Sequence, residues 1–186
     1  MSYTKIRNAI LTSILLLTLV PAVATAQQTE EQKLLTLINS YRKSNGLTEL
    51  QSSPMLTKAA AAHSQDMAQN NYFSHTSKSG QSPFDRMSAA GYNYNTYRGE
   101  NIAAGNSSAE RTFEQWKNSA PHNANMLSKN YKAIGIGLGY NNSSTYKYYW
   151  TTKFGGVVDG KESAKQPEAP TPKKRTSRLK PVSLYR

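Results

Sequence analysis

The chain has 186 residues and no cysteine, and its 23 basic and 11 acidic residues give a net charge of +12 at pH 7. The lack of cysteine excludes a disulfide scaffold, a cysteine nucleophile and a thiolate zinc site, so any metal would need histidine and carboxylate ligands. The positive charge is concentrated in residues 161–186, with 8 basic and 2 acidic residues, so specific binding of nucleic acid by the preceding domain is not expected.

The first 26 residues have the layout of a secretory signal peptide. Lys5 and Arg7 precede an apolar run from Ile10 to Val20, and Ala24-Thr25-Ala26 supplies the small residues of a cleavage site before Gln27. The apolar run is shorter than the roughly 20 residues that a membrane-spanning helix needs. We therefore predict cleavage and a secreted protein, extracellular or in the cell envelope, with an uncleaved N-terminal anchor as the alternative.

Four amphipathic helices are predicted between residues 29 and 117. Each begins with an N-cap hydroxyl and continues with apolar side chains at helical spacing. The caps are Thr29 in a capping box, Ser53 and Ser82 each followed by proline, and Ser107. His63 falls within the second helix, where we interpret it as a partly buried side chain paired with Asp66 or with backbone.

Residues 133–154 predict a β-hairpin. Apolar residues alternate with small residues over 133–140, and aromatic residues alternate over 146–154. The glycines of the first strand indicate that another element packs closely on that face. A weaker third strand is predicted at residues 92–97. Helices followed by a small antiparallel sheet predict one α+β domain over residues 27–160.

Two groups of tyrosines accompany these elements. They are Tyr92, Tyr94 and Tyr97, and Tyr146, Tyr148 and Tyr149. Packing in the core or on the sheet is expected, because aromatic burial can stabilise a chain that has no disulfides. The alternative is a platform for a lipid or carbohydrate ligand. Nearby, Arg98 is expected to form an ion pair with Glu100.

Residues 161–186 form a basic tail rich in proline and lysine, which predicts disorder. Such a tail could contact polyanions, such as cell-wall polymers or anionic lipid, through its charge. It could equally remain solvated without a fixed partner.

Three residues are candidates for a binding site. His75 lies in the irregular segment NNYFSHTSKSG, Glu100 in RGENIAAG and His122 in WKNSAPHNANML. We place all three in loops, where binding groups usually lie. Two imidazoles and one carboxylate could bind zinc and leave a position open for water. Their spacing is not diagnostic, so hydrogen-bonding structure is the open alternative.

Five segments occur in an order that resembles the CAP superfamily, also called the SCP domain, in its compact, cysteine-free bacterial form. They are NYFSHTSKSGQSPFDRMSAAGY, GENIA, W-x-x-S-x-x-H-x-x-x-ML, IGIGLGY and YYWTTKFG, within about residues 31–156. The resemblance implies an α-β-α sandwich with a three-stranded antiparallel sheet. It also implies a cleft lined by His75, Glu100 and His122, with Ser119 where many relatives have a second glutamate.

The predicted function is therefore a secreted, non-enzymatic binding module. The resemblance implies that its cleft would bind a divalent metal such as zinc, or a small apolar ligand such as a lipid or sterol, or would contact an envelope component. The alternative is a zinc-dependent hydrolase acting on peptide or cell-wall material, with His75, His122 and Glu100 as metal ligands. Ser119 cannot replace a second carboxylate in such a mechanism.

Overall fold

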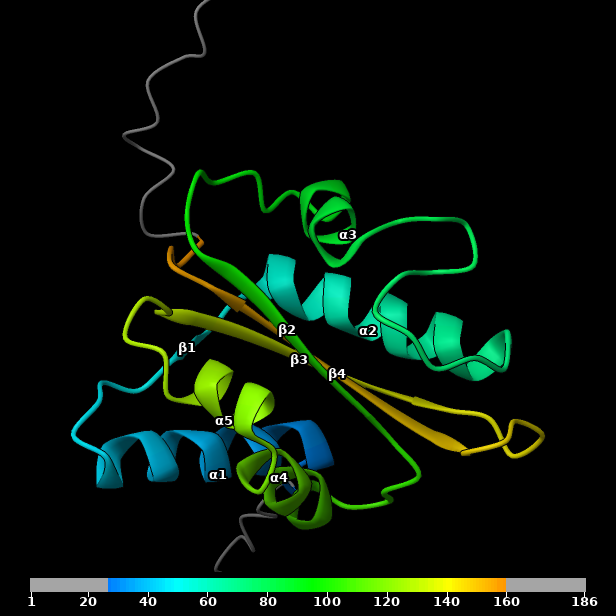
Figure 1. The fold of residues 1–186 in the computed structure, drawn as a ribbon, viewed down its shortest axis with the longest axis horizontal. Helices are drawn as coiled ribbons and strands as arrows, with labels where there is room; N and C mark the ends of the chain where they lie inside the picture. The colour runs from blue at the N-terminus through cyan, green and yellow to red at the C-terminus, as the bar shows by residue number, and fades with distance from the viewer. Residues whose placement is uncertain (1–26, 160–186) are drawn as a thin grey trace, which may run out of the picture.

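The computed structural model describes residues 27–159 (Figure 1). The predicted signal peptide and the basic tail lie outside the described residues. The elements in chain order are α1 (Glu30–Ser44), β1 (Gln51–Ser52), α2 (Pro54–Gln69), α3 (Pro83–Ala89), β2 (Arg98–Ala104), α4 (Ala109–Lys117), α5 (Ala120–Met126), β3 (Ala133–Tyr140) and β4 (Tyr148–Gly155). Across the described part, no helix is both long and apolar enough to span a bilayer.

One mixed sheet forms the middle layer, with the strand order β1-β3-β4-β2. The strands β3 and β4 form the predicted hairpin, and β2 pairs antiparallel to β4. The prediction of three antiparallel strands is wrong, because β1 adds a fourth strand that runs parallel to β3. A two-residue strand is too short to show any alternation of apolar and polar residues.

The third strand was expected at residues 92–97, but β2 begins at Arg98. Tyr92 instead lies fully buried in the irregular segment before β2, where its hydroxyl donates to the carbonyl of Val157 at 2.6 Å. The strand β2 is not recognisable from the sequence, because Glu100 and Asn101 occupy buried positions in it. A buried strand that contains polar residues does not alternate in the way that predicts a strand.

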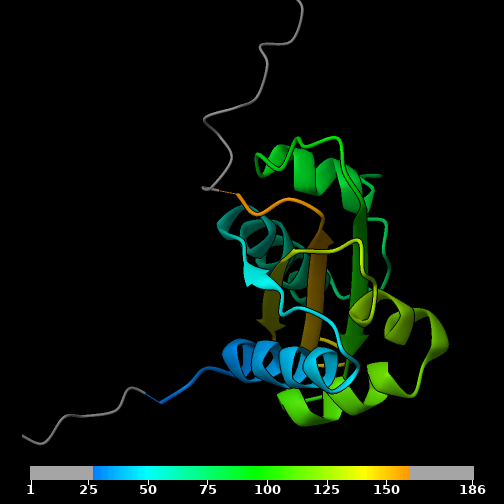
Figure 2. The same ribbon diagram turned by 90° about the vertical axis from the view of Figure 1, so that its left-hand side faces the viewer.

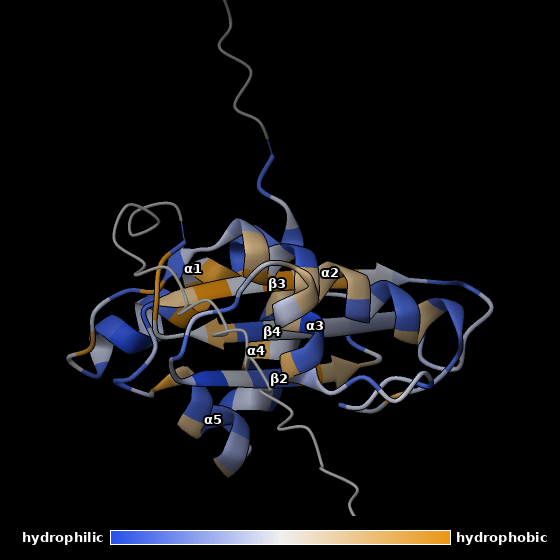
Figure 3. Ribbon diagram, turned by 90° about the horizontal axis from the view of Figure 1, so that it is seen from above, coloured by the Kyte–Doolittle hydropathy of each residue, from blue (hydrophilic) through white to orange (hydrophobic). Residues whose placement is uncertain are grey.

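Helices cover both faces of the sheet, which gives an α-β-α sandwich. Figure 2 shows α2 and α3 on one side and α1, α4 and α5 on the other. The main hydrophobic core lies on the α1 side, where Leu34 and Ile38 pack with Ile134 and Ile136 of β3. Seen from above, hydrophobic stretches of α1 and β3 lie beside each other between the layers (Figure 3).

The opposite face of β3 is made of glycines, and α2 packs directly on them. A Cβ atom added at Gly135, Gly137 or Gly139 would overlap backbone atoms of α2. The predicted close packing on this face is therefore confirmed. No side chain separates the strand from the helix, so α2 lies close to the sheet. This contact fixes the position of the C-terminal end of α2.

Three of the four predicted N-caps are present, at Thr29, Ser53 and Ser82. The fourth helix is capped by Ser108, one residue after the predicted Ser107. In these four helices the N-cap hydroxyl accepts a hydrogen bond from a backbone amide in the first turn, which satisfies a donor that has no partner within the helix.

Candidate functional site

A buried glutamate, Glu100, lies at the centre of the candidate site. Only 2% of its side chain is exposed. One carboxylate oxygen accepts from Nδ1 of His75 at 2.6 Å, and the other accepts from the guanidinium of Arg86 at 3.0 Å and from Nζ of Lys153. The expected partner was Arg98, but its guanidinium lies over the ring of Phe84, 4.8 Å from the centroid.

The groups around Glu100 keep it ionised. Burial by itself raises the pKa of Glu100, but the hydrogen bond from His75 and the charge of Lys153 outweigh it and lower this pKa to about 2. The pKa of Lys153 falls to about 8, because desolvation of its ammonium exceeds the stabilisation by Glu100. Glu100 is therefore a carboxylate at neutral pH, with both oxygens already occupied.

The carboxylate of Glu100 sets the tautomer of His75. An ionised oxygen can only accept, so Nδ1 of His75 carries a proton, and in the neutral ring Nε2 is the nitrogen with the lone pair. Half of the His75 side chain is exposed. The segment around it is also held, because Arg86 donates to the carbonyl of His75 at 2.7 Å and Nε2 of His63 donates to that of Ser74 at 3.0 Å.

His122 lies on α5, a helix that was not predicted. Ser119 is the N-cap of this helix and a proline lies in its first turn, but the hydroxyl of Ser119 makes no cap hydrogen bond. Nδ1 of His122 is buried without a partner. Burial lowers the pKa of His122, and the nearby His75 lowers it further. His122 therefore stays neutral to a lower pH than an exposed histidine.

His75 and His122 line the same cavity, which has a volume of about 440 Å³. Its lining residues are Phe73, Ser74, His75, Thr76, Ile102, Gln115 and His122. The cavity lies beside β2, the edge strand that runs in front of the sheet in Figure 1, and it receives residues from the 73–76 segment and from α4 and α5. Ser119 is close in sequence but is not among the lining residues.

The sequence-based prediction missed Arg86 and Lys153, the two cations that hold Glu100. Lys153 is fully buried in β4, among Thr151, Thr152 and Phe154, which are also buried. One lysine inside a strand that is otherwise apolar or neutral was the available signal, because a buried ammonium needs an anionic partner. Arg86 gave no comparable signal, because short surface helices commonly carry arginine.

His63 supports the site from behind and does not line the His75–His122 cavity. Its side chain is fully buried on α2. The predicted pairing with backbone is confirmed, through Ser74. Asp66, the other expected partner, instead accepts from the amide of Asn70 and the hydroxyl of Tyr72. Because Nε2 of His63 donates to a carbonyl, Nδ1 is the unprotonated nitrogen, and it is buried without a partner.

Replacing His63 by glutamine is expected to flatten the dependence of stability on pH. Burial lowers the pKa of His63 from 6.5 to about 4. The unfolded chain takes up a proton on His63 near pH 6.5, and the folded chain takes it up only near pH 4. The free energy of unfolding therefore falls by about 3 kcal/mol as the pH falls through this window. Urea unfolding at pH 7 and pH 4.5 measures the difference, and His122→Gln serves as the less buried comparison. Equal pH slopes for the wild type and His63→Gln would contradict this assignment.

Comparison with known proteins agrees with the fold. The model of CAP, the cysteine-rich secretory protein family, matches residues 35–154. The uncharacterized protein YkwD of Bacillus subtilis is 41% identical over 126 residues, which are 68% of this chain and 47% of YkwD. The uncharacterized membrane protein YlbC of the same organism is 36% identical over 112 residues, 60% of this chain and 32% of YlbC. The chain thus spans half or less of these relatives.

Two solved structures are similar. An extracellular protein containing an SCP domain from Bacillus anthracis has 31% identity and a TM-score of 0.62, over 69% of this chain and 40% of that one. An outer surface protein of Borrelia burgdorferi has 23% identity and a TM-score of 0.61, over 69% of this chain and 94% of that one, and this shows the shared fold. The match to the family model covers more than half of the chain, including His75, Glu100 and His122. The chain therefore belongs to the CAP family.

Proposed function

We propose that the chain is a secreted CAP-domain binding module that holds its ligand in the cavity between His75 and His122. The observation that carries the proposal is the hydrogen bond from Nδ1 of His75 to Glu100, which leaves Nε2 free. A buried network of one anion and two cations is costly to desolvate, and here it orients a half-exposed imidazole. The extracellular and outer-surface relatives support the secreted location.

We infer that the imidazoles of this cavity are the groups that would hold a divalent metal. Nε2 of His75 and a nitrogen of His122 are available donors, and a bound zinc ion would polarise a ligand or water oxygen. Glu100 was expected as a third ligand, but both of its oxygens are engaged by His75, Arg86 and Lys153. Over residues 27–159 no group of three or more histidine or carboxylate side chains is placed to hold a metal. We therefore propose a two-histidine site that is completed by water or by the ligand itself.

A small apolar ligand fits a different cavity better. A cavity of about 330 Å³ lies between α1, α2 and β3, with Leu35, Ala61, Ile134 and Ile136 among its lining residues. These four side chains would contact an acyl or sterol-like surface, and the polar half of the lining, Thr29, Glu31, Gln32, Ser52 and Thr57, would face the polar end of such a ligand.

Hydrolysis is less well supported than binding. Glu100, with a pKa of about 2 and no free oxygen, cannot take up a proton near neutral pH. Among the described residues, no hydrogen bond joins the hydroxyl of Ser119 to His122, so no activated serine is formed. The group that could accept a proton from water is Nε2 of His75.

The proposal predicts that zinc binding depends on both cavity histidines. Calorimetric titration of the full chain with zinc at pH 7.5 should show binding that is weakened at least tenfold in His75→Ala and in His122→Ala. Glu49→Gln is the control and should bind like the wild type, because Glu49 is exposed and does not line the cavity. Binding should also be lost as the pH falls below about 6.5, because imidazole must be neutral to bind a metal.

Three results would change this conclusion. Zinc binding of unchanged strength in both alanine variants would place the metal elsewhere. Zinc binding that persists at pH 5 would argue against imidazole ligands. Hydrolysis of a peptide or of cell-wall material that disappears in both variants would favour the enzyme over the binding module.

A further inference from the structure

We propose that the cavity binds a β-1,4-linked saccharide chain, one of whose rings stacks on an aromatic pair formed by Phe73 and Tyr146. This inference rests on the proposed function, because it names the ligand class of the same cavity. It is carried by three observations: the placement of the pair, the rigidity of its support, and the neutral polar lining beside it.

The aromatic pair joins two distant segments of the chain at the edge of the cavity. Phe73 is 43% exposed and Tyr146 is 46% exposed, and their ring centroids are 6.0 Å apart. Phe73 also lines the cavity together with His75. Five large hydrophobic side chains are exposed over residues 27–159, and of these only Phe73 and Tyr146 are in ring contact with each other. Two contacting aromatic rings left open to solvent beside a cavity indicate a binding surface.

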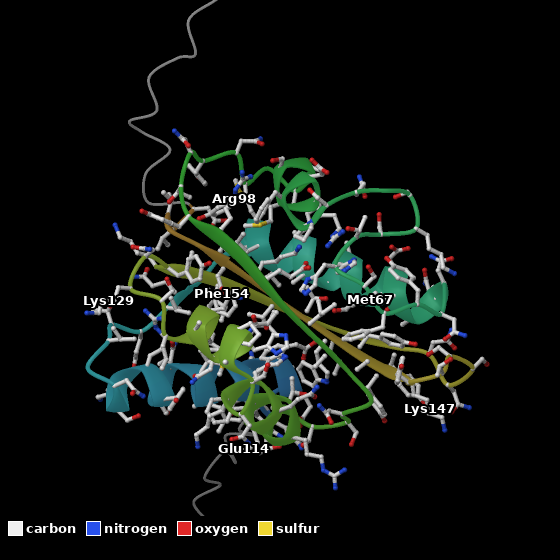
Figure 4. The ribbon with its side chains drawn as sticks, viewed as in Figure 1. Met67, Arg98, Glu114, Lys129, Lys147 and Phe154 are labelled. Atoms are coloured by element: carbon white, nitrogen blue, oxygen red, sulfur yellow. The ribbon has the colours of Figure 1, made fainter. Side chains whose placement is uncertain are left out.

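The backbone holds the aromatic pair in place. The segment before Phe73 and the β3–β4 loop are tied together, because the side chain of Asn71 accepts from the backbone amide of Thr145 at 2.8 Å. Asn141 of the same loop donates to the carbonyl of Ala68 at 3.0 Å. Figure 4 marks the position of this loop by Lys147, at the opposite end of the molecule from Arg98. A surface that is already rigid loses little conformational entropy when a ligand binds.

Two turns flank the aromatic pair. Over residues 27–159, Asn71 and Lys147 are the only non-glycine residues with positive φ, at 49° and 63°. Asn71 follows the C-cap residue of α2, a position where asparagine commonly adopts a left-handed conformation, and Lys147 ends the β3–β4 loop. These turns fix where the chain enters the segment of Phe73 and where it leaves Tyr146.

The rest of the cavity lining favours a neutral, hydroxyl-rich ligand. Five of the seven lining residues carry hydrogen-bonding side chains: Ser74, His75, Thr76, Gln115 and His122. None of the seven is acidic, lysine or arginine, and Glu100 is hidden beneath His75. Sugar hydroxyls both donate and accept, so they match hydroxyl, amide and imidazole groups. A β-1,4-linked chain also presents flat C–H faces, which pack on aromatic rings.

An extended peptide is a poorer match for this surface. A peptide would bind most simply by pairing with the edge strand β2. The carbonyls of Glu100 and Ile102 in that strand already accept from side chains, those of Asn125 at 3.3 Å and Trp116 at 3.2 Å. A lipid chain is also disfavoured, because only Phe73 and Ile102 of the lining residues are apolar.

The test is calorimetric titration of the full chain with chitohexaose and cellohexaose, two soluble β-1,4-linked probes. At least one probe should bind to the wild type. Phe73→Ala and Tyr146→Ala should each weaken its binding about tenfold, the value expected for one aromatic contact. Tyr97→Ala is the matched control, because Tyr97 is 63% exposed but does not line the cavity. Thermal unfolding of each variant checks that the fold is retained.

The outcomes separate this inference from the proposed function. If neither probe binds while zinc still binds through His75 and His122, the saccharide inference is wrong and the binding site stands. If a probe binds equally to the wild type and to both aromatic variants, the stacking surface is wrong. If vesicles of phosphatidylcholine bind the wild type and lose binding in the aromatic variants, while the saccharides do not bind, the ligand is a lipid and the inference is overturned.

Discussion

Replacing Glu100 by glutamine is expected to lower the free energy of unfolding by about 3–5 kcal/mol, the usual effect of breaking a buried ion pair from one side. Glutamine preserves the shape of the side chain but leaves the charges of Arg86 and Lys153 without an anion. Only 7% and 0% of those two side chains are exposed, so water cannot compensate. Because domains are marginally stable, this loss is a large share of the total. Urea unfolding at pH 7 measures the effect.

Two further variants test the cause. Glu114→Gln makes the same chemical change in an exposed pair with Lys117, whose atoms are 3.5 Å apart, and it should have little effect. Adding Lys153→Met to Glu100→Gln should recover part of the lost stability, because it removes one of the two unpaired cations. A loss of less than about 1 kcal/mol for Glu100→Gln alone would show that this network is not what holds the site.

The substitution Gly137→Ala is expected to destabilise the fold by about 3 kcal/mol or more, at or above the upper end of typical overpacking effects. The new methyl group would overlap the backbone of Ala61 in α2. A side chain could rotate away, but the backbone of a helix packed along three glycines can move only as a unit. The same displacement would shift the C-terminal end of α2, which leads into the segment that carries His75.

Gly46→Ala is the matched control for this prediction. It adds the same methyl group where nothing lies within 4 Å, at a φ of 71°. It should lower the free energy of unfolding by only about 1 kcal/mol, the cost of placing a Cβ atom on a left-handed backbone. The difference in urea midpoint between the two variants therefore isolates the contact between β3 and α2. Equal destabilisation by both would contradict the packing account.

Much of the fold could be predicted from the sequence because its signals are local. A hydroxyl followed by proline at Ser53 and Ser82 marks a helix start within two residues. The glycines of β3 indicated close packing because only a missing side chain allows a helix to lie that near. By contrast, β1 is only two residues long, and α5 begins at Ser119 without a side-chain cap. For β1 no local signal exists, and for α5 the signal is Ser119 with a proline two residues later, which is weaker than the serine-proline pairs at Ser53 and Ser82.

The sequence predicts the histidines and the glutamate of the candidate site, but it does not predict the two cations that hold the glutamate. His75, Glu100 and His122 stand out because histidines are few and the segments resemble a known family. The sequence predicts Glu100 in a loop as a metal ligand, but it is buried in β2 and engaged by Arg86 and Lys153. Which cations approach a buried carboxylate depends on how β4 and α3 pack against β2, and this is a tertiary property that spacing along the chain does not encode.

The most direct test of the site is the imidazole ¹⁵N spectrum of the full chain during a zinc titration. The chain has three histidines, so three sets of signals are expected. The account predicts that His75 is protonated on Nδ1 and His63 on Nε2, and that zinc shifts the signals of His75 and His122 together while those of His63 stay unchanged. A His75 ring protonated on Nε2, or zinc shifts that do not include both His75 and His122, would contradict it.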